Sequence, residues 1–291
     1  KQRGRQVTFL CGTGGLDALE AVLWRVSYPQ CPEPRLERSK KALDRLIDTA
    51  LAVVSEAQAD ELLAGRAGVL HAVLFVRSEL EGEHCIPLDE RESRLLGKAE
   101  RLLTERILQN GMACAEKKGL LAPLMYEYYG AMCLGAAHGV AGIAQQLLSA
   151  RLEEEQLVLV ADAVLYLTTK VFPSGNLMSQ EDSTQDNLVQ WCHGAPALSL
   201  VCTRLYRRVA SPQYAATHAA DAQPRASAAL AAAVASSDVV WQRGMLNKGL
   251  GMCHGMGGNA MVFLDLWEVT RERLHLLRAC RFFEAAMQGQ H

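Results

Sequence analysis

A short glycine-rich element that recurs along the chain constrains its fold more than any other feature of the sequence. The five copies begin at Gly12, Gly65, Gly139, Gly194 and Gly255. Each copy is followed by an apolar stretch, and glycine lets the start of a helix approach its neighbours where a Cβ atom would clash. Five copies in one context predict a repeated unit, with about one helical hairpin for each element.

The apolar residues between these elements have helical spacing, at i, i+3, i+4 and i+7. One predicted helix face consists of Leu43, Leu46, Ile47, Ala50 and Leu51, a second of Leu157, Val160, Ala161, Val164 and Leu165, and a third, looser one of Leu264, Leu266, Val269 and Leu274. We find no convincing series of alternating strands, so the predicted class is all-α. An open solenoid has polar capping repeats, whereas this chain starts and stops in apolar repeat material. We therefore expect a ring of hairpins with pieces missing.

The whole chain, 1–291, is interpreted as one domain of this kind. Its Ala/Ser-rich segment 210–237 contains Pro212 and Pro224 and predicts a surface loop that runs into an Ala-rich helix, inserted within the domain. The net charge of −2 gives no indication of a nucleic-acid partner. Nine cysteines, an odd number, do not form a disulfide framework and favour a reducing, cytoplasmic compartment.

Two of the five elements have a Cys-His pair directly before the glycine, as Cys192-His193 and Cys253-His254. Equivalent ends of repeated hairpins converge on one mouth of a ring. Two thiolates and one imidazole suit Zn²⁺, and three ligands leave a fourth position open, which is typical of catalytic zinc. We predict one zinc ion on Cys192, Cys253 and His254. The alternative is that these residues are buried thiols and capping histidines.

The other candidate residues surround this predicted mouth. His138 occupies the equivalent position of a third element without a cysteine, where an imidazole can donate or accept a proton or can simply cap a helix. Lys248 lies five residues before Cys253 and would favour an anionic thiol, unless it is a plain surface lysine. A glycosidase would need a pair of carboxylates. Asp60 and Glu61 lie close together, but in one repeat alone, where a helix-end charge explains them.

Several stretches together resemble one known family, the eukaryotic LanC-like proteins, which are relatives of the bacterial lanthionine cyclases. The similar stretches are Thr8-Phe9-Leu10-Cys11-Gly12, Leu124-Met125-Tyr126-Glu127, Gly135-Ala136-Ala137-His138-Gly139, Phe172-Pro173-Ser174-Gly175-Asn176, Trp191-Cys192-His193-Gly194-Ala195-Pro196 and Cys253-His254-Gly255. The resemblance implies a double-layered α/α toroid of seven hairpins, with a single zinc on Cys192, Cys253 and His254. It also implies that His138 is the acid/base residue and that Lys248 helps to hold glutathione.

The reaction implied by the resemblance is addition of the glutathione thiolate to dehydroalanine or dehydrobutyrine residues of proteins or peptides. In this reaction a thiol adds across an activated alkene, and an acid must protonate the α-carbon. His138 is the first candidate for this acid, and His193, beside a zinc ligand, is the second. Where the family has Tyr in its bacterial cyclases this chain has His193, which argues against lantibiotic cyclisation. The alternative function is a non-catalytic, zinc-containing scaffold that binds glutathione or a signalling partner.

The chain also departs from the family pattern. Five glycine elements, against seven hairpins in the family, indicate that the first and last repeats are lacking. The divergence from the better-known members and the Ala-rich segment favour the third mammalian paralogue. The resemblance allows peripheral association with the plasma membrane in addition to the cytoplasmic location.

Overall fold

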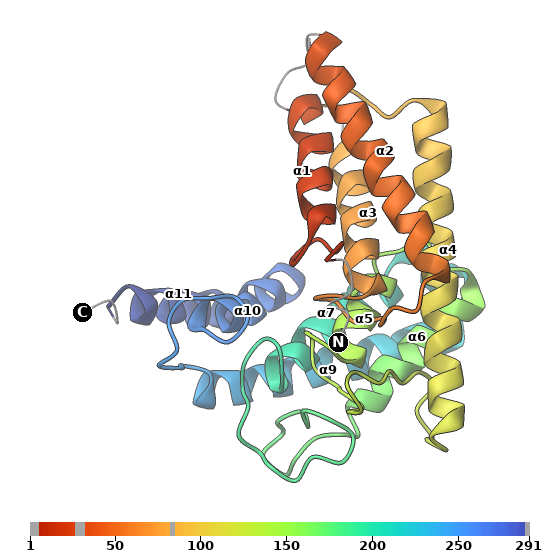
Figure 1. Ribbon diagram of the computed structural model, residues 1–291. Coiled ribbons are helices and arrows are strands. Elements are labelled where there is room, and N and C mark those ends of the chain that lie inside the picture. The colour runs from red at the N-terminus through yellow and green to blue at the C-terminus, as the bar shows by residue number, and fades with distance from the viewer. Residues whose placement is uncertain (1–5, 27–32, 82–84, 289–291) are drawn as a thin grey trace.

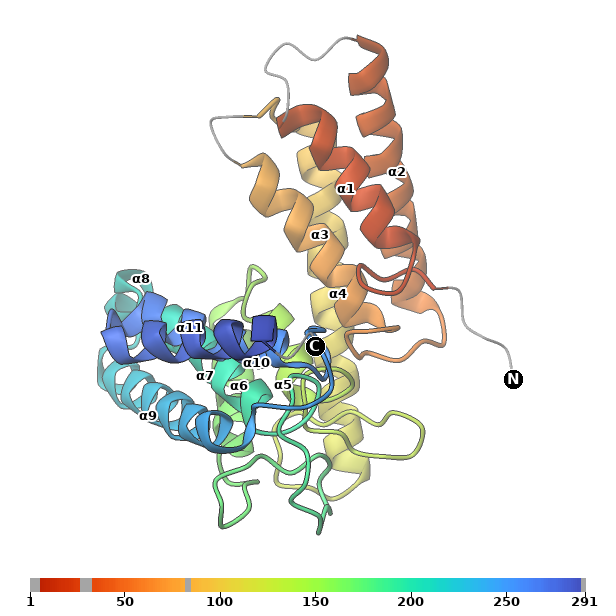
Figure 2. The same ribbon diagram turned by 90° about the vertical axis from the view of Figure 1, so that its left-hand side faces the viewer.

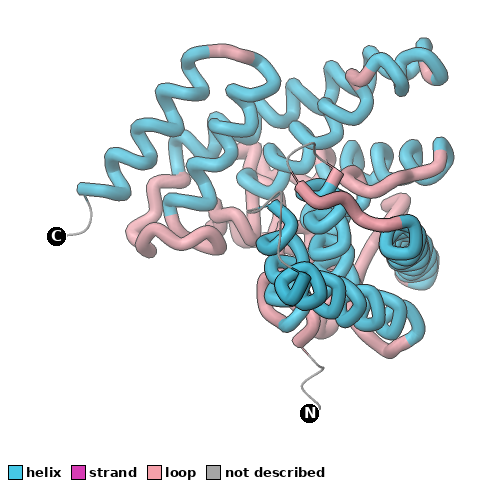
Figure 3. Tube along the Cα trace, turned by 90° about the horizontal axis from the view of Figure 1, so that it is seen from above, coloured by secondary structure: helices cyan, strands magenta, loops and turns pink. Residues whose placement is uncertain are grey.

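The structure is a computed structural model that describes residues 6–26, 33–81 and 85–288, and within these ranges it contains helices and loops but no strand (Figures 1 and 3). The helices are α1 (Thr13–Val26), α2 (Glu33–Ser55), α3 (Arg66–Leu80), α4 (Glu90–Lys117), α5 (Val140–Leu147), α6 (Glu154–Leu167), α7 (Ala195–Val209), α8 (Pro212–Thr217), α9 (Ala219–Arg243), α10 (Met256–Thr270) and α11 (Arg273–Gln288). The predicted all-α class is confirmed.

The helices pair into five successive hairpins within the described residues, α1/α2, α3/α4, α5/α6, α7/α9 and α10/α11, with the short α8 between α7 and α9. The first helix of each hairpin follows one glycine element, as the repeat predicted. These first helices pack against one another in chain order, from α1 to α3, α5, α7 and α10. This inner row, backed by second helices, is the layered arrangement of an α/α toroid. The five described hairpins form an arc, with α1 and α11 at its two ends (Figure 2).

Backbone hydrogen bonds join the loops that carry successive glycine elements. The amide of Leu62 donates to the carbonyl of Ala137 over 3.2 Å, and the amide of Ala137 donates to the carbonyl of Cys192 over 3.4 Å. The amide of Cys192 in turn donates to the carbonyl of Cys253 over 3.1 Å. Four loops distant in sequence therefore lie side by side, and they bring the residues just before α3, α5, α7 and α10 to one end of the inner row.

Two of the three predicted helix faces form as expected. Leu43, Leu46, Ile47 and Ala50 are buried on α2 and Leu51 is half-buried. The corresponding residues of α6 are buried except for a half-buried Leu165. The third face is wrong at Leu274, which is exposed and belongs to α11. The helix break explains the error, because α10 ends at Thr270 and Arg271 adopts the left-handed conformation.

The Ala/Ser-rich segment 210–237 is more helical than predicted. In place of a surface loop, α8 and then α9 occupy most of it, and Pro224 lies inside α9. Alanine has the highest helix propensity of all residues, and the alanines around Pro224 favour the helix although proline is unfavourable within it. Because α9 packs along α7, this segment supplies the outer helix of the fourth hairpin.

Among the described helices none is both long and apolar enough to cross a membrane.

Candidate metal centre

The three predicted metal ligands come together at the end of the inner row. One donor atom each from Cys192, Cys253 and His254 lies within 4.8 Å of the other two, and no other group of three or more potential ligands of this kind occurs among the described residues. Cys192 is buried, Cys253 half-buried and His254 exposed. Two sulfurs and one imidazole at this spacing can share a single ion at bond lengths of about 2.3 Å and about 2.0 Å.

The protonation of the thiols supports this fit. Burial, followed by the neighbouring Cys253, raises the pKa of Cys192 to about 12. Two adjacent thiolates therefore do not form at neutral pH without a cation between them. A divalent ion would supply the missing charge, so the donor set fits zinc, and its partly exposed side leaves room for a further ligand.

A tight loop fixes the position of Cys192. The amide of Gln190 donates to the carbonyl of His193 over 3.0 Å, and the amide of His193 returns a bond of 2.9 Å to the carbonyl of Gln190. The next residue, Gly194, has a φ of 96°, a conformation that favours glycine. A Cβ atom there would also meet the carbonyl oxygen of Leu188 at 2.0 Å. The glycine is therefore required for the turn that presents the thiol.

Asn176 clamps the same turn from a distant segment. Its Oδ1 atom accepts from the amide of Ala195 over 2.7 Å, in the first turn of α7, and its Nδ2 atom donates to the carbonyl of Leu188 over 3.0 Å. Asp186 accepts a further bond of 2.8 Å from Nδ2. In the sequence only the family resemblance points to Asn176. Its contacts show a structural role, because they hold the Cys192 loop in place.

Gln190 is a residue of the site that the sequence reasoning missed. It is 8% exposed, and its Nε2 atom donates to Sγ of Cys192 over 3.2 Å. Its Oε1 atom accepts from Nζ of Lys248 over 3.0 Å. The lysine thus fixes which end of the amide faces the sulfur, and the N–H group stabilises negative charge on that sulfur. Lys248 is otherwise exposed to solvent.

His138 has a partner that the sequence reasoning set aside. Its Nδ1 atom lies 2.7 Å from Oε2 of Glu61, which is 1% exposed and also accepts from the amides of Leu63, over 2.9 Å, and Ala64. The ring stacks on Tyr128, with centroids 4.3 Å apart and planes 6° apart. The interpretation of Glu61 as a mere helix-end charge is therefore incomplete. Asp60, in contrast, pairs with Arg66.

His193 lies between the predicted ligands and His138. It directly follows Cys192 in the sequence, and the Cys192 carbonyl accepts from the amide of Ala137, the residue before His138. Burial, followed by the charge of His138, lowers the pKa of its imidazole, and its Nδ1 atom is buried without a hydrogen-bond partner within the described part of the chain. The backbone brings the two loops together, because a Cβ atom on Gly135, three residues before His138, would lie 3.0 Å from Cα of His193. The structure thus groups all the predicted residues: three potential ligands, two histidines and one lysine.

In the part of the chain that the structure describes, each hairpin of helices begins at a glycine element, and a Cys, Cys, His cluster lies at one end of the inner row. These features define a helical protein with a candidate metal centre. The model of the family described as "Lanthionine synthetase C-like protein" matches residues 2–291, and the chain belongs to this family.

Two curated relatives are similar over nearly the whole chain. The zebrafish (Danio rerio) "Glutathione S-transferase LANCL1" is 33% identical over 298 residues, which cover 99% of this chain and 65% of the relative. The Arabidopsis thaliana "LanC-like protein GCL1" is 32% identical over 96% of this chain and 59% of the relative. The chain therefore spans about three fifths of the length of these relatives. Among solved structures, nisin cyclase aligns with a TM-score of 0.49 at 14% identity, over 97% of this chain and 82% of that chain.

Proposed function

We propose that this protein binds one zinc ion on Cys192, Cys253 and His254 and catalyses the addition of glutathione to dehydroalanine or dehydrobutyrine residues of proteins. The observation that carries the proposal is the convergence of the three donor atoms within 4.8 Å from two separate repeats. It is supported by the similarity to a relative named glutathione S-transferase. When bound, the zinc ion would supply the positive charge that keeps a thiol substrate ionised at neutral pH.

The residues around the three ligands have distinct roles in this proposal. Gln190 donates to the Cys192 sulfur and so limits the charge that this ligand places on the metal. Lys248 lies at the rim, where its ammonium group can pair with a carboxylate of glutathione. The ammonium group of Lys248 would then contact both the substrate carboxylate and Gln190. This arrangement places the glutathione next to the ligand thiols.

The reaction balances without any oxidant or reductant. The thiolate sulfur forms a bond to the β-carbon of the dehydro residue, and the π electrons of the C=C bond move toward the α-carbon and its carbonyl. A proton then adds to the α-carbon, so the net change is addition of S–H across the double bond. His138 is the proposed proton donor. With Glu61 accepting from Nδ1–H, Nε2 takes up the proton that the thiol loses and then delivers it to the α-carbon, and His193 is the second candidate for this role.

The test is to incubate the zinc-loaded protein with glutathione and a dehydroalanine peptide, and to follow the thioether product by mass spectrometry. We expect addition by the wild-type chain, loss of both zinc and product in Cys253→Ala, and loss of product with zinc retained in His138→Asn. Zinc binding without any product from the wild-type chain would contradict the enzymatic proposal. That result would favour the alternative, a zinc-containing scaffold that binds glutathione.

A further inference from the structure

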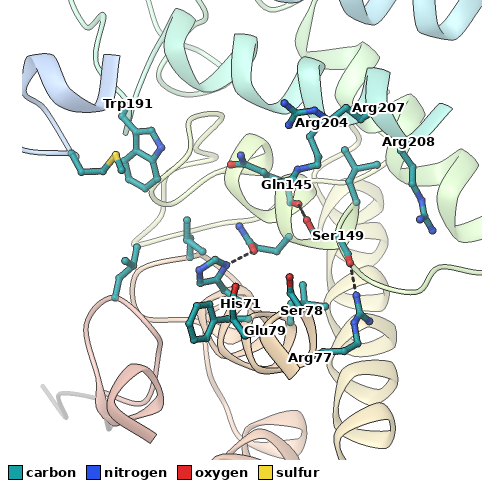
Figure 4. Close-up of a pocket in the computed structure, with 17 residues that line it drawn as sticks. His71, Arg77, Ser78, Glu79, Gln145, Ser149, Trp191, Arg204, Arg207 and Arg208 are labelled. Atoms are coloured by element: carbon teal, nitrogen blue, oxygen red, sulfur yellow. Dashed lines mark hydrogen bonds between the residues drawn. The ribbon is translucent and has the colours of Figure 1, made fainter. Parts of the chain in front are cut away.

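A hollow of about 660 Å³ begins beside the candidate metal centre and extends along the inner helices (Figure 4). Trp191 and Met252, which line it, are the residues directly before Cys192 and Cys253. The rest of its wall comes mainly from α3, α5 and α7. Its volume is in the range of ligand pockets in proteins. A substrate that reacts at the metal centre can therefore continue into this hollow.

The charged side chains in the wall are mainly arginines, and most are on one helix. Figure 4 shows Arg204 and Arg207 of α7 close together and Arg208 to their right, all above His71 and Ser78 of α3.

Two of the wall's arginines already have anionic partners. Arg207 pairs with Asp265, at 2.6 Å, and with Glu268. Arg77 of α3 pairs with Glu100 and with Glu81. The one carboxylate in the wall, Glu79, lies on an exposed part of α3.

Arg204 and Arg208 differ from these paired arginines. Neither makes a hydrogen bond or ion pair with any residue of the described part, and the Nε atom of each is buried without a partner. Burial lowers the pKa of the Arg204 guanidinium, and this outweighs the opposing charge of Asp265. A buried donor without a partner is unfavourable, and guanidinium groups match carboxylates in a planar, two-bonded geometry. The two side chains therefore bring unpaired guanidinium groups to the wall of the hollow.

We propose that this hollow binds an acidic segment of the protein substrate, with substrate carboxylates on Arg204 and Arg208. The proposal rests on the proposed function, since it assigns the class of protein that the metal centre modifies. Peptide binding to the hollow is nevertheless measurable without the addition reaction.

Distance along α7 distinguishes a protein substrate from glutathione. At 1.5 Å per residue, Arg204 and Arg208 lie about 14 Å and about 20 Å along the helix from Ala195, near the metal centre. Glutathione is a tripeptide that spans about 10 Å when extended, with its thiol in the middle. A thiol held at Cys192 and Cys253 therefore leaves its carboxylates short of Arg208, the farther of the two arginines. An extended substrate chain reaches them about four to six residues from the reacting residue.

The experiment uses fluorescent peptides that have alanine at the reacting position, so that no addition occurs. One peptide carries two glutamates four to six residues before the alanine, a second carries them after it, and matched peptides carry glutamines. Fluorescence anisotropy with the full chain measures the dissociation constants. We expect one glutamate peptide to bind at least about tenfold more tightly than its glutamine counterpart, with an affinity that falls as salt rises.

The variant Arg204→Gln/Arg208→Gln should abolish this preference, while Arg204→Lys/Arg208→Lys should keep part of it. A matched control, Arg101→Gln/Arg281→Gln, removes two exposed, distant arginines and should bind like the wild type. If circular dichroism shows that the glutamine variant does not fold, the lysine variant and the salt titration of the wild type decide the question.

Equal affinity for glutamate and glutamine peptides, or an unchanged preference in the folded glutamine variant, would overturn the proposal. It would also be overturned if glutathione displaced the acidic peptide and lost affinity to the same extent in the glutamine variant, because the arginines would then serve the thiol substrate. A clear peptide preference in a chain that shows no addition would leave this inference standing and refute the enzymatic function alone.

Discussion

The Nδ1 atom of His138 lies 2.7 Å from Oε2 of Glu61, across 77 positions of sequence. Glu61 is held in turn by two backbone amides of its own loop, so its carboxylate is fixed before any substrate arrives. A buried carboxylate of this kind sets the tautomer and the orientation of an imidazole. Glu61, from a neighbouring repeat, therefore orients His138 for the proton transfer that we propose for it.

Replacing Glu61 with Gln tests this relationship. We expect kcat for glutathione addition to fall about tenfold to hundredfold, because His138 loses its orienting charge, while KM for glutathione and the zinc content stay unchanged. Glu61→Asp should recover part of the rate. The control is Glu56→Gln, an exposed residue that has no contact with His138. A parallel loss of zinc and thermal stability in Glu61→Gln would show that the carboxylate only supports the loop.

The contact between Gln190 and Cys192 predicts an effect on the metal itself. In Gln190→Leu the ligand sulfur loses an N–H donor, and we expect zinc affinity to fall about 10- to 100-fold. Lys248→Met should give a smaller loss, because the lysine acts on the sulfur only through the amide. Competition with a chromogenic chelator measures both, with the exposed Gln185→Leu as control. Wild-type affinity in Gln190→Leu would contradict this role.

Gly135 lies where the loop before α5 closely approaches the Cys192 loop, so the space at this position is tested by adding a side chain. A Cβ atom there would lie 2.2 Å from the carbonyl oxygen of Cys192. We expect Gly135→Ala to displace the Cys192 loop, to lower the free energy of unfolding by about 1–3 kcal/mol and to weaken zinc binding. Gly97→Ala, inside α4 with no atom within 4 Å, should instead stabilise the protein by about 0.5–1 kcal/mol. Urea unfolding of both variants checks this prediction. A free energy of unfolding in Gly135→Ala equal to that of the wild type would refute it.

The cluster around Asp186 predicts a pH dependence of stability. Burial alone would raise the pKa of Asp186, but hydrogen bonds from Ser174, Asn176 and Arg243 outweigh it and lower the pKa below its ordinary value of 3.8. A lowered pKa means that the ionised group stabilises the fold above pH 3.8, and that this contribution is lost as the pH falls through the lower, folded-state value.

Asp186→Asn should therefore lower the free energy of unfolding by about 1–2 kcal/mol at pH 7. The difference from the wild type should shrink as the pH falls below 3.8. Urea unfolding at several pH values measures it, with the exposed Asp182→Asn as control. A difference that stayed constant over this pH range would show that the charge of Asp186 does not contribute.

Much of the fold could be predicted because the repeat is local. Each glycine element lies directly before the helix that it starts, so five elements indicated five hairpins, and equivalent positions indicated that Cys192 and Cys253 would meet. The errors arose where local signals compete. The two prolines suggested a loop where alanine-rich helix forms, and Leu274 continued an apolar spacing past a helix end.

Glu61 and Gln190 could not be identified in the same way. Their roles depend on contacts between loops, with His138 for the first and with Lys248, 58 positions away, for the second. A single glutamate or glutamine beside a glycine element has no periodicity that marks it. Only the packing of adjacent repeats shows which polar side chains face the predicted ligands.

The most direct test of the central claim is the zinc content of the purified chain by elemental analysis. Cys253→Ser and Cys280→Ser form the matched pair, since Cys280 is an exposed free thiol on α11, away from the site. We predict one zinc per chain in the wild type and in Cys280→Ser, and loss of zinc in Cys253→Ser. A wild-type chain without zinc, or a Cys253→Ser chain that keeps it, would contradict the account.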